Sequence, residues 1–140
     1  MARRIVLDAN IVVRAVLGVR VPEVIERYAT SVSFFVPAVA LAEATTHLPA
    51  IAAKRGVDTT ALLEALDRFR RIVDVVPADV TAPFERAALA RVGGRDPRDW
   101  PIVAAALALS CPVWTEDHDF FGAGVPTWTT RNVEVYLRGD

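Results

Sequence analysis

Short apolar runs alternate along the whole chain between a pattern typical of a buried strand and one typical of a helix. The β-branched run in RIVLDAN (4–10) ends on Asp8, and the run SVSFFVP (31–37) ends at a proline; a helix-like segment follows each. Right-handed β-α-β crossovers leave few topologies for such an order. We therefore expect an α/β fold, a three-layer α/β/α sandwich with a central parallel sheet, in a single domain spanning residues 1–140.

The turn residues divide the chain into further elements. Besides the two strands just named, strands are expected at 72–77, 112–115 and 125–130. Helices are expected at 11–18, 23–28, 38–47, 59–71, 82–92 and 101–110. Pro49 should end or kink the helix that begins at Ala38, since a proline inside a helix removes a backbone donor and clashes with the preceding turn. Gly18 is a plausible residue to end the first helix.

The composition favours a cytoplasmic protein with no membrane contact. The longest apolar run, IVAAALAL, is far shorter than the roughly 20 residues that cross a bilayer, and no leader segment opens the chain. Cys111 is the single cysteine, so we expect a buried thiol rather than an internal disulfide or a metal ligand. A net charge of −1 by itself neither favours nor opposes a polyanionic partner.

Four carboxylates occupy positions where an unpaired charge is costly. Asp8 and Asp117 follow predicted strands, and Asp99 lies at the start of the apolar helix 101–110. In open parallel sheets the binding crevice lies beyond the carboxyl ends of the strands, so these three side chains are expected at one edge. Glu43 differs, since it lies in mid-helix among small apolar residues, where a carboxylate needs a partner.

Each of these acids also has an ordinary structural explanation. Asp8 and Asp99 could cap helices, Asp117 could form an Asx-turn, and Glu43 could face solvent. Capping explains neither Glu43 nor the convergence of acids from distant segments. Clustered carboxylates repel one another unless a cation neutralises them, and no Cys/His pattern for zinc is present. Mg²⁺ or Mn²⁺ is therefore the expected cofactor, and such a site suits phosphodiester hydrolysis.

Four segments of the chain resemble, in order, the acidic motifs of the PIN domain family. These are IVLDANIVVRAVLG, VPAVALAEAT, RDWPIVAAALAL and VWTEDHDFFGAG, and the resemblance extends from Arg4 to about Arg131. It implies a parallel sheet flanked by helices and a divalent-metal-dependent ribonuclease, in many bacterial members the VapC-like toxin of a toxin–antitoxin pair. It further implies an RNA substrate, a small antitoxin protein as partner, and a homodimer.

The resemblance also assigns roles to individual residues. Asp8, Glu43, Asp99 and Asp117 match the four acidic positions and are expected to be the catalytic, metal-binding residues. Two neighbours are expected to support them. Asn10 stands where many relatives carry Ser or Thr, which implies a polar contact to metal-bound water or phosphate, and Thr115 is expected to orient Asp117 or a water.

Other polar residues near these motifs remain ambiguous. Asp96 is either a turn former before Pro97 or a supporting ligand, and Asp119 either supports the site or caps the segment that begins at Phe120. His118 lies beside the acids but need not be a base, since metal-bound water supplies the nucleophile. His47 lies one helical turn from Glu43, which permits a contact, although a partly exposed structural histidine is the alternative.

RNA binding requires cations around the acids. Candidates in or near the expected strand-end loops are Arg14, Arg95, Arg98 and Arg131, each with a solvated surface role as the alternative. The three tryptophans, Trp100, Trp114 and Trp128, are expected in the core or packed on a sheet face rather than as stacking platforms for bases.

Two other functions compete with a ribonuclease. The first is a non-catalytic RNA-binding or regulatory module with the same pocket; inactive relatives lose one or more acids, whereas this sequence keeps all four. The second is a phosphatase-like hydrolase, which usually offers Asp-x-Asp and a lysine. Here position 10 is asparagine and Lys54 is the only lysine, so this class is disfavoured.

Overall fold

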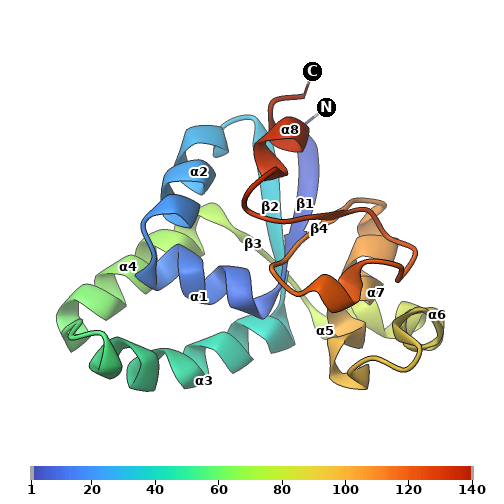
Figure 1. The fold of residues 1–140 in the computed structure, drawn as a ribbon, viewed down its shortest axis with the longest axis horizontal. Coiled ribbons are helices and arrows are strands. Elements are labelled where there is room, and N and C mark those ends of the chain that lie inside the picture. Colours follow the sequence, from blue (N-terminus) through green and yellow to red (C-terminus); the bar gives the residue numbers. More distant parts are fainter. Residues whose placement is uncertain (1, 140) are drawn as a thin grey trace.

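A parallel sheet lies at the centre of the molecule, with helices on both sides (Figure 1). The computed structural model describes residues 2–139, so the first and last residues of the expected domain lie outside the described part. Within that part the sheet has five strands in the order β3-β2-β1-β4-β5, all paired in parallel. The strands are β1 (Arg3–Leu7), β2 (Val32–Pro37), β3 (Asp74–Val76), β4 (Val113–Trp114) and β5 (Thr127–Trp128). The expected α/β fold and its strands are confirmed.

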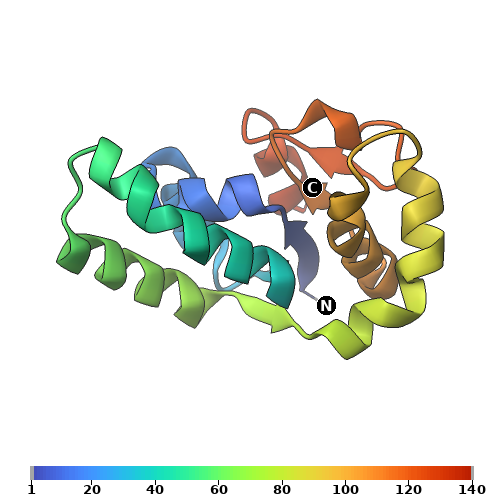
Figure 2. The ribbon, with the colours of Figure 1, turned by 90° about the horizontal axis from the view of Figure 1, so that it is seen from below.

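The helices divide into two groups. In Figures 1 and 2, helices α1 to α4 lie on one side of the sheet and α5 to α7 on the other. Their bounds are α1 (Ala9–Leu17), α2 (Arg20–Tyr28), α3 (Ala38–Lys54), α4 (Thr59–Ile72), α5 (Ala78–Thr81), α6 (Glu85–Val92), α7 (Trp100–Leu109) and α8 (Val133–Leu137). Short 3₁₀ turns cover Ala82–Phe84, Pro97–Asp99 and His118–Phe120. No helix within residues 2–139 has both the length and the apolar character needed to cross a membrane.

The core explains why α7 is apolar around its whole circumference. This helix packs against β1 and β2, and its residues from Pro101 to Ala106 are all buried. Trp114 on β4 is fully buried with its ring centroid 6.4 Å from that of Phe34, so the expectation of a core tryptophan is confirmed here. Because α7 enters the core immediately at Pro101, the residue just before the helix, Asp99, is held at the edge of the sheet.

The expectation that Pro49 ends its helix is wrong. Helix α3 continues past Pro49 to Lys54. Ala44, Leu48 and Ala52 recur every four residues and are buried at 2% exposure or less, whereas Pro49 is exposed. Burial of the residues beyond the proline therefore offsets its cost of about 3 kcal/mol in a helix interior.

Three other boundaries differ from the expected ones. The predicted helix 82–92 is divided into a 3₁₀ turn and α6, and α5 precedes it. Helix α2 begins at Arg20 rather than Glu23, and the short α8 was not expected. Gly18 does end α1, but with φ −90°; the glycine is needed because a Cβ atom would lie 2.5 Å from the carbonyl oxygen of Arg14.

Helix α8 is fastened to α2 by one carboxylate. Glu134 accepts hydrogen bonds from the guanidinium groups of Arg20 and Arg27, the latter at 2.7 Å, and from the Tyr28 hydroxyl at 3.0 Å. Charge-assisted hydrogen bonds of this kind are stronger than neutral ones. They hold α8 against α2.

Candidate functional site

Asp8 lies where β1 ends and α1 begins, and its two carboxylate oxygens have different partners. Oδ1 accepts a hydrogen bond from the backbone N–H of Ala9 at 2.7 Å, which caps the helix. Oδ2 accepts from the hydroxyl of Thr115 at 2.7 Å and from Nδ2 of Asn10 at 3.1 Å. The side chain is only 7% exposed. Capping therefore accounts for one oxygen, and the other belongs to a network that reaches the neighbouring strand.

Thr115 links the ends of the two adjacent strands β1 and β4. It is fully buried, and the pairing of Leu7 with Trp114 places it beside Asp8. Its Oγ1 accepts hydrogen bonds from the backbone N–H of Asp117 at 2.9 Å and from Nδ2 of Asn10 at 3.1 Å. One hydroxyl thus fixes both Asp8 and the backbone that carries Asp117.

Asp117 follows this junction and begins the 3₁₀ turn His118–Phe120. Its Oδ1 accepts a hydrogen bond from the backbone N–H of Asp119 at 2.9 Å, as in the Asx-turn considered from the sequence. Asp117 itself, not Asp119, is the capping residue here. Asp119 is exposed, and no hydrogen bond to its carboxylate occurs within the described chain.

Asp99 has no such structural role. It occupies the position before α7, but its side chain does not cap the helix, and within residues 2–139 no hydrogen bond reaches its carboxylate. Partial burial, and then repulsion by Asp8, Asp96, Asp117 and Glu43, raises the pKa of Asp99 from 3.8 to about 7. A carboxyl group with so costly an ionised form and no internal partner is a candidate ligand for an external cation.

The four acids lie within electrostatic range of one another. Burial raises the pKa of Asp8, and Asp117 and Glu43 add to the rise, against hydrogen bonds from Thr115 and Ala9 that lower it. Glu43 itself is exposed, on α3. Figure 2, seen from below, looks onto the carboxyl ends of the strands, where α1 and α3 begin. The structure thus brings Asp8, Glu43, Asp99 and Asp117 together from four distant segments.

A groove of about 660 Å³ opens beside these acids. Glu43, Arg98, Trp100 and Pro101 line the side nearest Asp99, and residues of α5 and α6 line the far side. Trp100 is therefore only partly buried, in contrast to Trp114. Glu43 has no hydrogen bond to the exposed His47 within the described residues, so the contact that their spacing permits is not formed.

Two of the four candidate arginines, Arg95 and Arg98, are hydrogen-bonded within the described chain. Asp96 caps the 3₁₀ turn before α7 and binds the guanidinium of Arg98 through Nε at 3.1 Å and Nη2 at 2.9 Å. These contacts hold the pKa of Asp96 below its usual range, which agrees with a turn former. Arg95 donates from Nη2 to the carbonyl oxygen of Phe121 at 2.9 Å. Arg14 and Arg131 are exposed.

Two residues that support the site gave no sequence signal. Glu116 donates its backbone N–H to Oδ1 of Asn10 at 3.1 Å, and its side chain accepts hydrogen bonds from the backbone N–H and the hydroxyl of Thr130. Nε1 of Trp114 also donates to the Thr130 hydroxyl, at 3.1 Å. Only the pairing of β4 with β5 brings these residues together, so no local pattern could reveal them.

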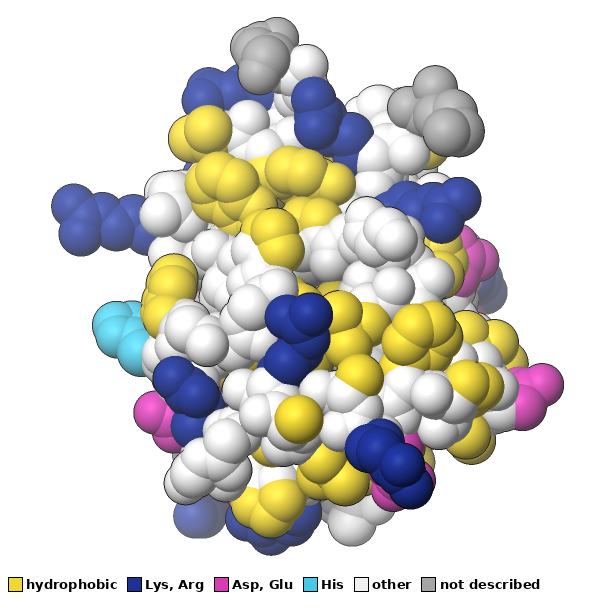
Figure 3. Space-filling view, turned by 90° about the vertical axis from the view of Figure 1, so that its right-hand side faces the viewer, with side chains coloured by type: hydrophobic (Ala, Val, Ile, Leu, Met, Phe, Trp, Pro, Cys, Tyr) yellow, Lys and Arg dark blue, Asp and Glu magenta, His cyan; other side chains and the backbone are white. Residues whose placement is uncertain are grey.

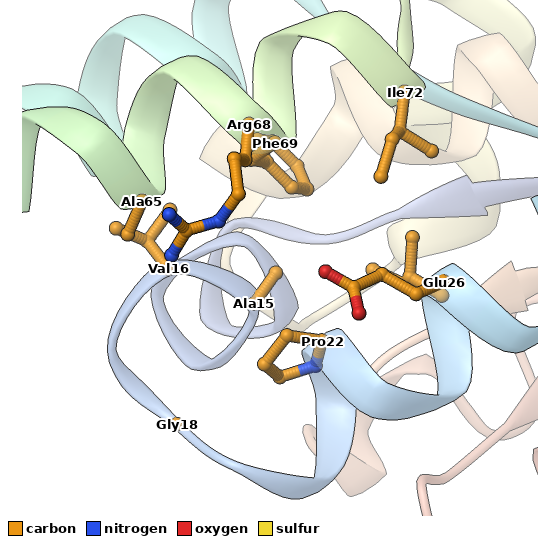
Figure 4. A pocket seen from close by; sticks show the side chains of 10 residues that line it. Ala15, Val16, Gly18, Pro22, Glu26, Ala65, Arg68, Phe69 and Ile72 are labelled. Atoms are coloured by element: carbon orange, nitrogen blue, oxygen red, sulfur yellow. The ribbon is translucent and has the colours of Figure 1, made fainter.

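A second, smaller cavity lies away from the acids. It has a volume of about 90 Å³ and is enclosed by α1, α2 and α4; Figure 4 shows Glu26 and Arg68 extending toward it from α2 and α4. Its lining includes Gly18, at the end of α1 opposite Asp8. Helix α1 rises about 1.5 Å per residue, and its length separates this cavity from the acidic site.

The donor set suits a hard divalent cation. Within residues 2–139 no three His, Cys, Asp or Glu side chains stand close enough to enclose a metal ion. Mg²⁺ does not require such a cage, since it usually keeps several waters and binds one or two carboxylates directly. Asp99, with a raised pKa and no hydrogen-bond donor, and the buried Asp8 offer oxygen ligands of this kind.

We expect Thr115→Val to lower the free energy of unfolding by about 1–3 kcal/mol. The substitution keeps the shape of the side chain but leaves the backbone N–H of Asp117 without its buried acceptor and removes a donor from Asp8. Urea denaturation measures the change. Thr115→Ser, which retains the hydroxyl, should recover most of the loss; equal stability of the valine variant and the wild type would contradict the linking role of Thr115.

Comparison with known proteins identifies the family. The sequence matches the PIN domain family over residues 6–138. The chain belongs to the PIN domain family. The resemblance to this family is thereby confirmed, and since PIN domains are generally nucleases that typically use a divalent metal, the match supports a nuclease at the level of the family. None of the curated proteins compared with the chain matches it.

Solved structures share the PIN fold at low sequence identity. PAE2754 from Pyrobaculum aerophilum has a TM-score of 0.73 at 17% identity, over 100% of this chain and 92% of that one. VapBC2 from Rickettsia felis, bound to a DNA fragment from its promoter, has a TM-score of 0.66 at 18% identity, over 90% and 98%. FitAcB from Neisseria gonorrhoeae has a TM-score of 0.57 at 18% identity, over 91% and 98%. These similarities agree in fold with the sheet described above.

Proposed function

We propose that the chain is a divalent-metal-dependent endoribonuclease that hydrolyses phosphodiester bonds of RNA. The observation that carries this proposal is the position of Asp99. Its half-buried carboxylate lies among Asp8, Glu43 and Asp117 with a pKa near 7 and, within the described chain, no hydrogen bond. Arg98 lies within electrostatic range of Asp99, but its guanidinium is hydrogen-bonded to Asp96, and the pKa of Asp99 is still raised, which is the property expected of a site that binds a cation.

Each of the site residues has a role in this proposal. Asp8 and Asp99 would bind Mg²⁺ or Mn²⁺ directly, and Asp117 and Glu43, the latter at the exposed side of the site, would contribute through metal-bound water. The bound metal would supply a phosphate-binding position and an acidified water. Thr115 and Asn10 hold the Asp8 carboxylate in one orientation through the two hydrogen bonds to Oδ2. Since hydrogen bonds to a metal-binding carboxylate keep it in place, they reduce the reorganisation needed when metal and substrate bind.

We further infer that the nuclease is the toxin of a toxin–antitoxin pair and acts in the cytoplasm. The resemblance to VapC-like proteins and the fold shared with VapBC2 and FitAcB support an antitoxin partner. A homodimer is supported by three exposed valines, Val39, Val75 and Val80, which line the groove beside the acids or adjoin residues that do. Sedimentation equilibrium tests the dimer, and copurification with the product of an adjacent reading frame tests the antitoxin.

The nuclease activity is tested with the purified chain and a single-stranded RNA substrate. We expect cleavage with Mg²⁺ or Mn²⁺ and its complete loss when EDTA removes the metal, because hydrolysis requires the cation between the carboxylates and the phosphate. Cleavage that persists in EDTA would contradict the proposal. RNA binding without turnover under every divalent metal would instead favour the non-catalytic module considered from the sequence.

A further inference from the structure

The exposed rings of His118 and Phe121 touch each other at the rim of the acidic site. Phe120 and Phe121 are consecutive, yet Phe120 is 2% exposed and Phe121 is 47% exposed. The ring of Phe121 meets the exposed ring of His118 edge to face, with centroids 5.7 Å apart and an interplanar angle of 83°. His118 directly follows Asp117. Phe120 therefore fixes the loop in the core, and the aromatic pair His118–Phe121 projects beside the carboxylates.

The backbone that carries this aromatic pair is held in place. The N–H of Phe121 donates to the carbonyl oxygen of His118 at 3.1 Å, and the guanidinium of Arg95 binds the carbonyl oxygen of Phe121. Gly122 has φ +90° and a Cβ there would lie 3.0 Å from Nη2 of Arg95, so a glycine lets the arginine approach. The exposure of Phe121 is thus a fixed feature, which lowers the entropy cost of binding a partner to it.

The surroundings favour RNA over a purely apolar partner. Arg95 supplies a cation at the pair itself, bound to the carbonyl oxygen of Phe121, and Figure 3 shows further Lys and Arg side chains among hydrophobic ones on the face over α6 and α7. A phosphate backbone suits such cations, and bases of single-stranded RNA stack on exposed Phe and His rings. A single exposed Phe needs no explanation, whereas a fixed pair of rings next to the proposed cleavage site provides a surface of the right kind.

We propose that the His118–Phe121 pair is a stacking platform for a base of single-stranded RNA that adjoins the phosphate to be cleaved. This assignment rests on the proposed ribonuclease function and extends it to substrate recognition. The platform contacts the flat face that every base has, so it favours unpaired over duplex RNA without selecting one base. It adds a role for His118, which the sequence placed beside the acids, and for Phe121, to which the sequence gave no role.

The test compares Phe121→Ala with Phe121→Tyr, which keeps a ring, and with Val135→Ala, an exposed hydrophobic residue on α8. Fluorescence anisotropy with a short labelled single-stranded RNA in EDTA gives Kd, and cleavage with Mn²⁺ gives kcat/KM. We expect Phe121→Ala to raise Kd and lower kcat/KM by about 5- to 100-fold, the range expected for loss of one stacked base. Phe121→Tyr and Val135→Ala should remain close to wild type, and affinity for duplex RNA should not change.

The outcomes separate the platform from the proposed function. If the wild type cleaves RNA and Phe121→Ala is unaffected in both measurements, the platform is wrong and the nuclease stands. If the wild type binds single-stranded RNA through Phe121 but cleaves under no metal, the platform stands and the nuclease is wrong. A change of oligomeric state in Phe121→Ala without a change in Kd would identify a protein contact instead and overturn the platform.

Discussion

Asp99→Asn is expected to abolish RNA cleavage and, in metal-free buffer near neutral pH, to make the protein more stable. Cleavage should fall by at least about 100-fold, since even loss of a residue that only orients a metal ligand costs about 10- to 100-fold. Stability should rise because the ionised carboxylate is partly buried and is repelled by the neighbouring acids, Asp8 foremost, and within residues 2–139 no hydrogen bond is lost with it. Opposite effects on activity and stability are typical of a group kept for function.

The gain in stability from Asp99→Asn should depend on pH. In the folded chain the pKa of Asp99 is about 7, against an ordinary value of 3.8, so the folded state holds this proton more tightly than the unfolded state. Asp99 therefore makes the wild type lose stability as pH rises from about 4 to about 7, and the variant lacks this contribution. A pKa difference of this size corresponds to about 4 kcal/mol if fully expressed; partial exposure of the group reduces the expected gain to about 1–2 kcal/mol.

Thermal unfolding in EDTA at about pH 4 and about pH 8 measures this difference, at roughly 2–4 °C per kcal/mol for a chain near this size. Asp74→Asn serves as a control, because Asp74 is an exposed aspartate on β3, away from the four acids. The control should follow the wild type at both pH values. If Asp99→Asn melts at the wild-type temperature near pH 8, the carboxylates are not crowded and the main support for a cation site is lost.

The sequence predicted which carboxylates lie together because their positions follow from local rules. Asp8 and Asp117 follow strands, Asp99 precedes an apolar helix, and all parallel strands end at one edge. Glu43 could be placed only through the family resemblance, since its mid-helix position does not fix the direction of its side chain. The structure has these four acids close enough for Asp8, Asp117 and Glu43 to raise the pKa of Asp99.

Features that depend on tertiary packing could not be predicted from the sequence. Pro49 does not end α3 because Leu48 and Ala52 are buried against other elements, which no propensity describes. The hydrogen bonds between Glu116 and Thr130 depend on the register of β4 and β5. Local patterns specify the order of elements and the residues at their ends, whereas contacts between distant segments require the fold itself.

Asp8→Asn is also expected to lower cleavage by at least about 100-fold, since it alters another proposed metal ligand of the same site. Its effect on stability should have the opposite sign to that of Asp99→Asn. Oδ2 of Asp8 accepts from two donors, Thr115 and Asn10, while Oδ1 accepts from the N–H of Ala9. An asparagine side chain has only one oxygen, so it can accept either from Thr115 and Asn10 or from the N–H of Ala9, but not from both sides.

Both orientations of the new amide lose hydrogen bonds. With its NH₂ toward Thr115, it faces an oxygen that already accepts from Asn10 and Asp117; with its NH₂ toward Ala9, the cap of α1 is lost. An unsatisfied buried donor costs about 1–3 kcal/mol, and we expect this cost to exceed the gain from removing a buried, repelled charge, because the hydrogen bonds from Thr115 and Ala9 already offset part of that charge's cost. Urea denaturation in EDTA should therefore show Asp8→Asn below wild type and Asp99→Asn above it. If both variants gain stability, burial of charge outweighs the hydrogen bonds from Thr115 and Asn10, and those residues do not hold Asp8 in the way inferred from their distances.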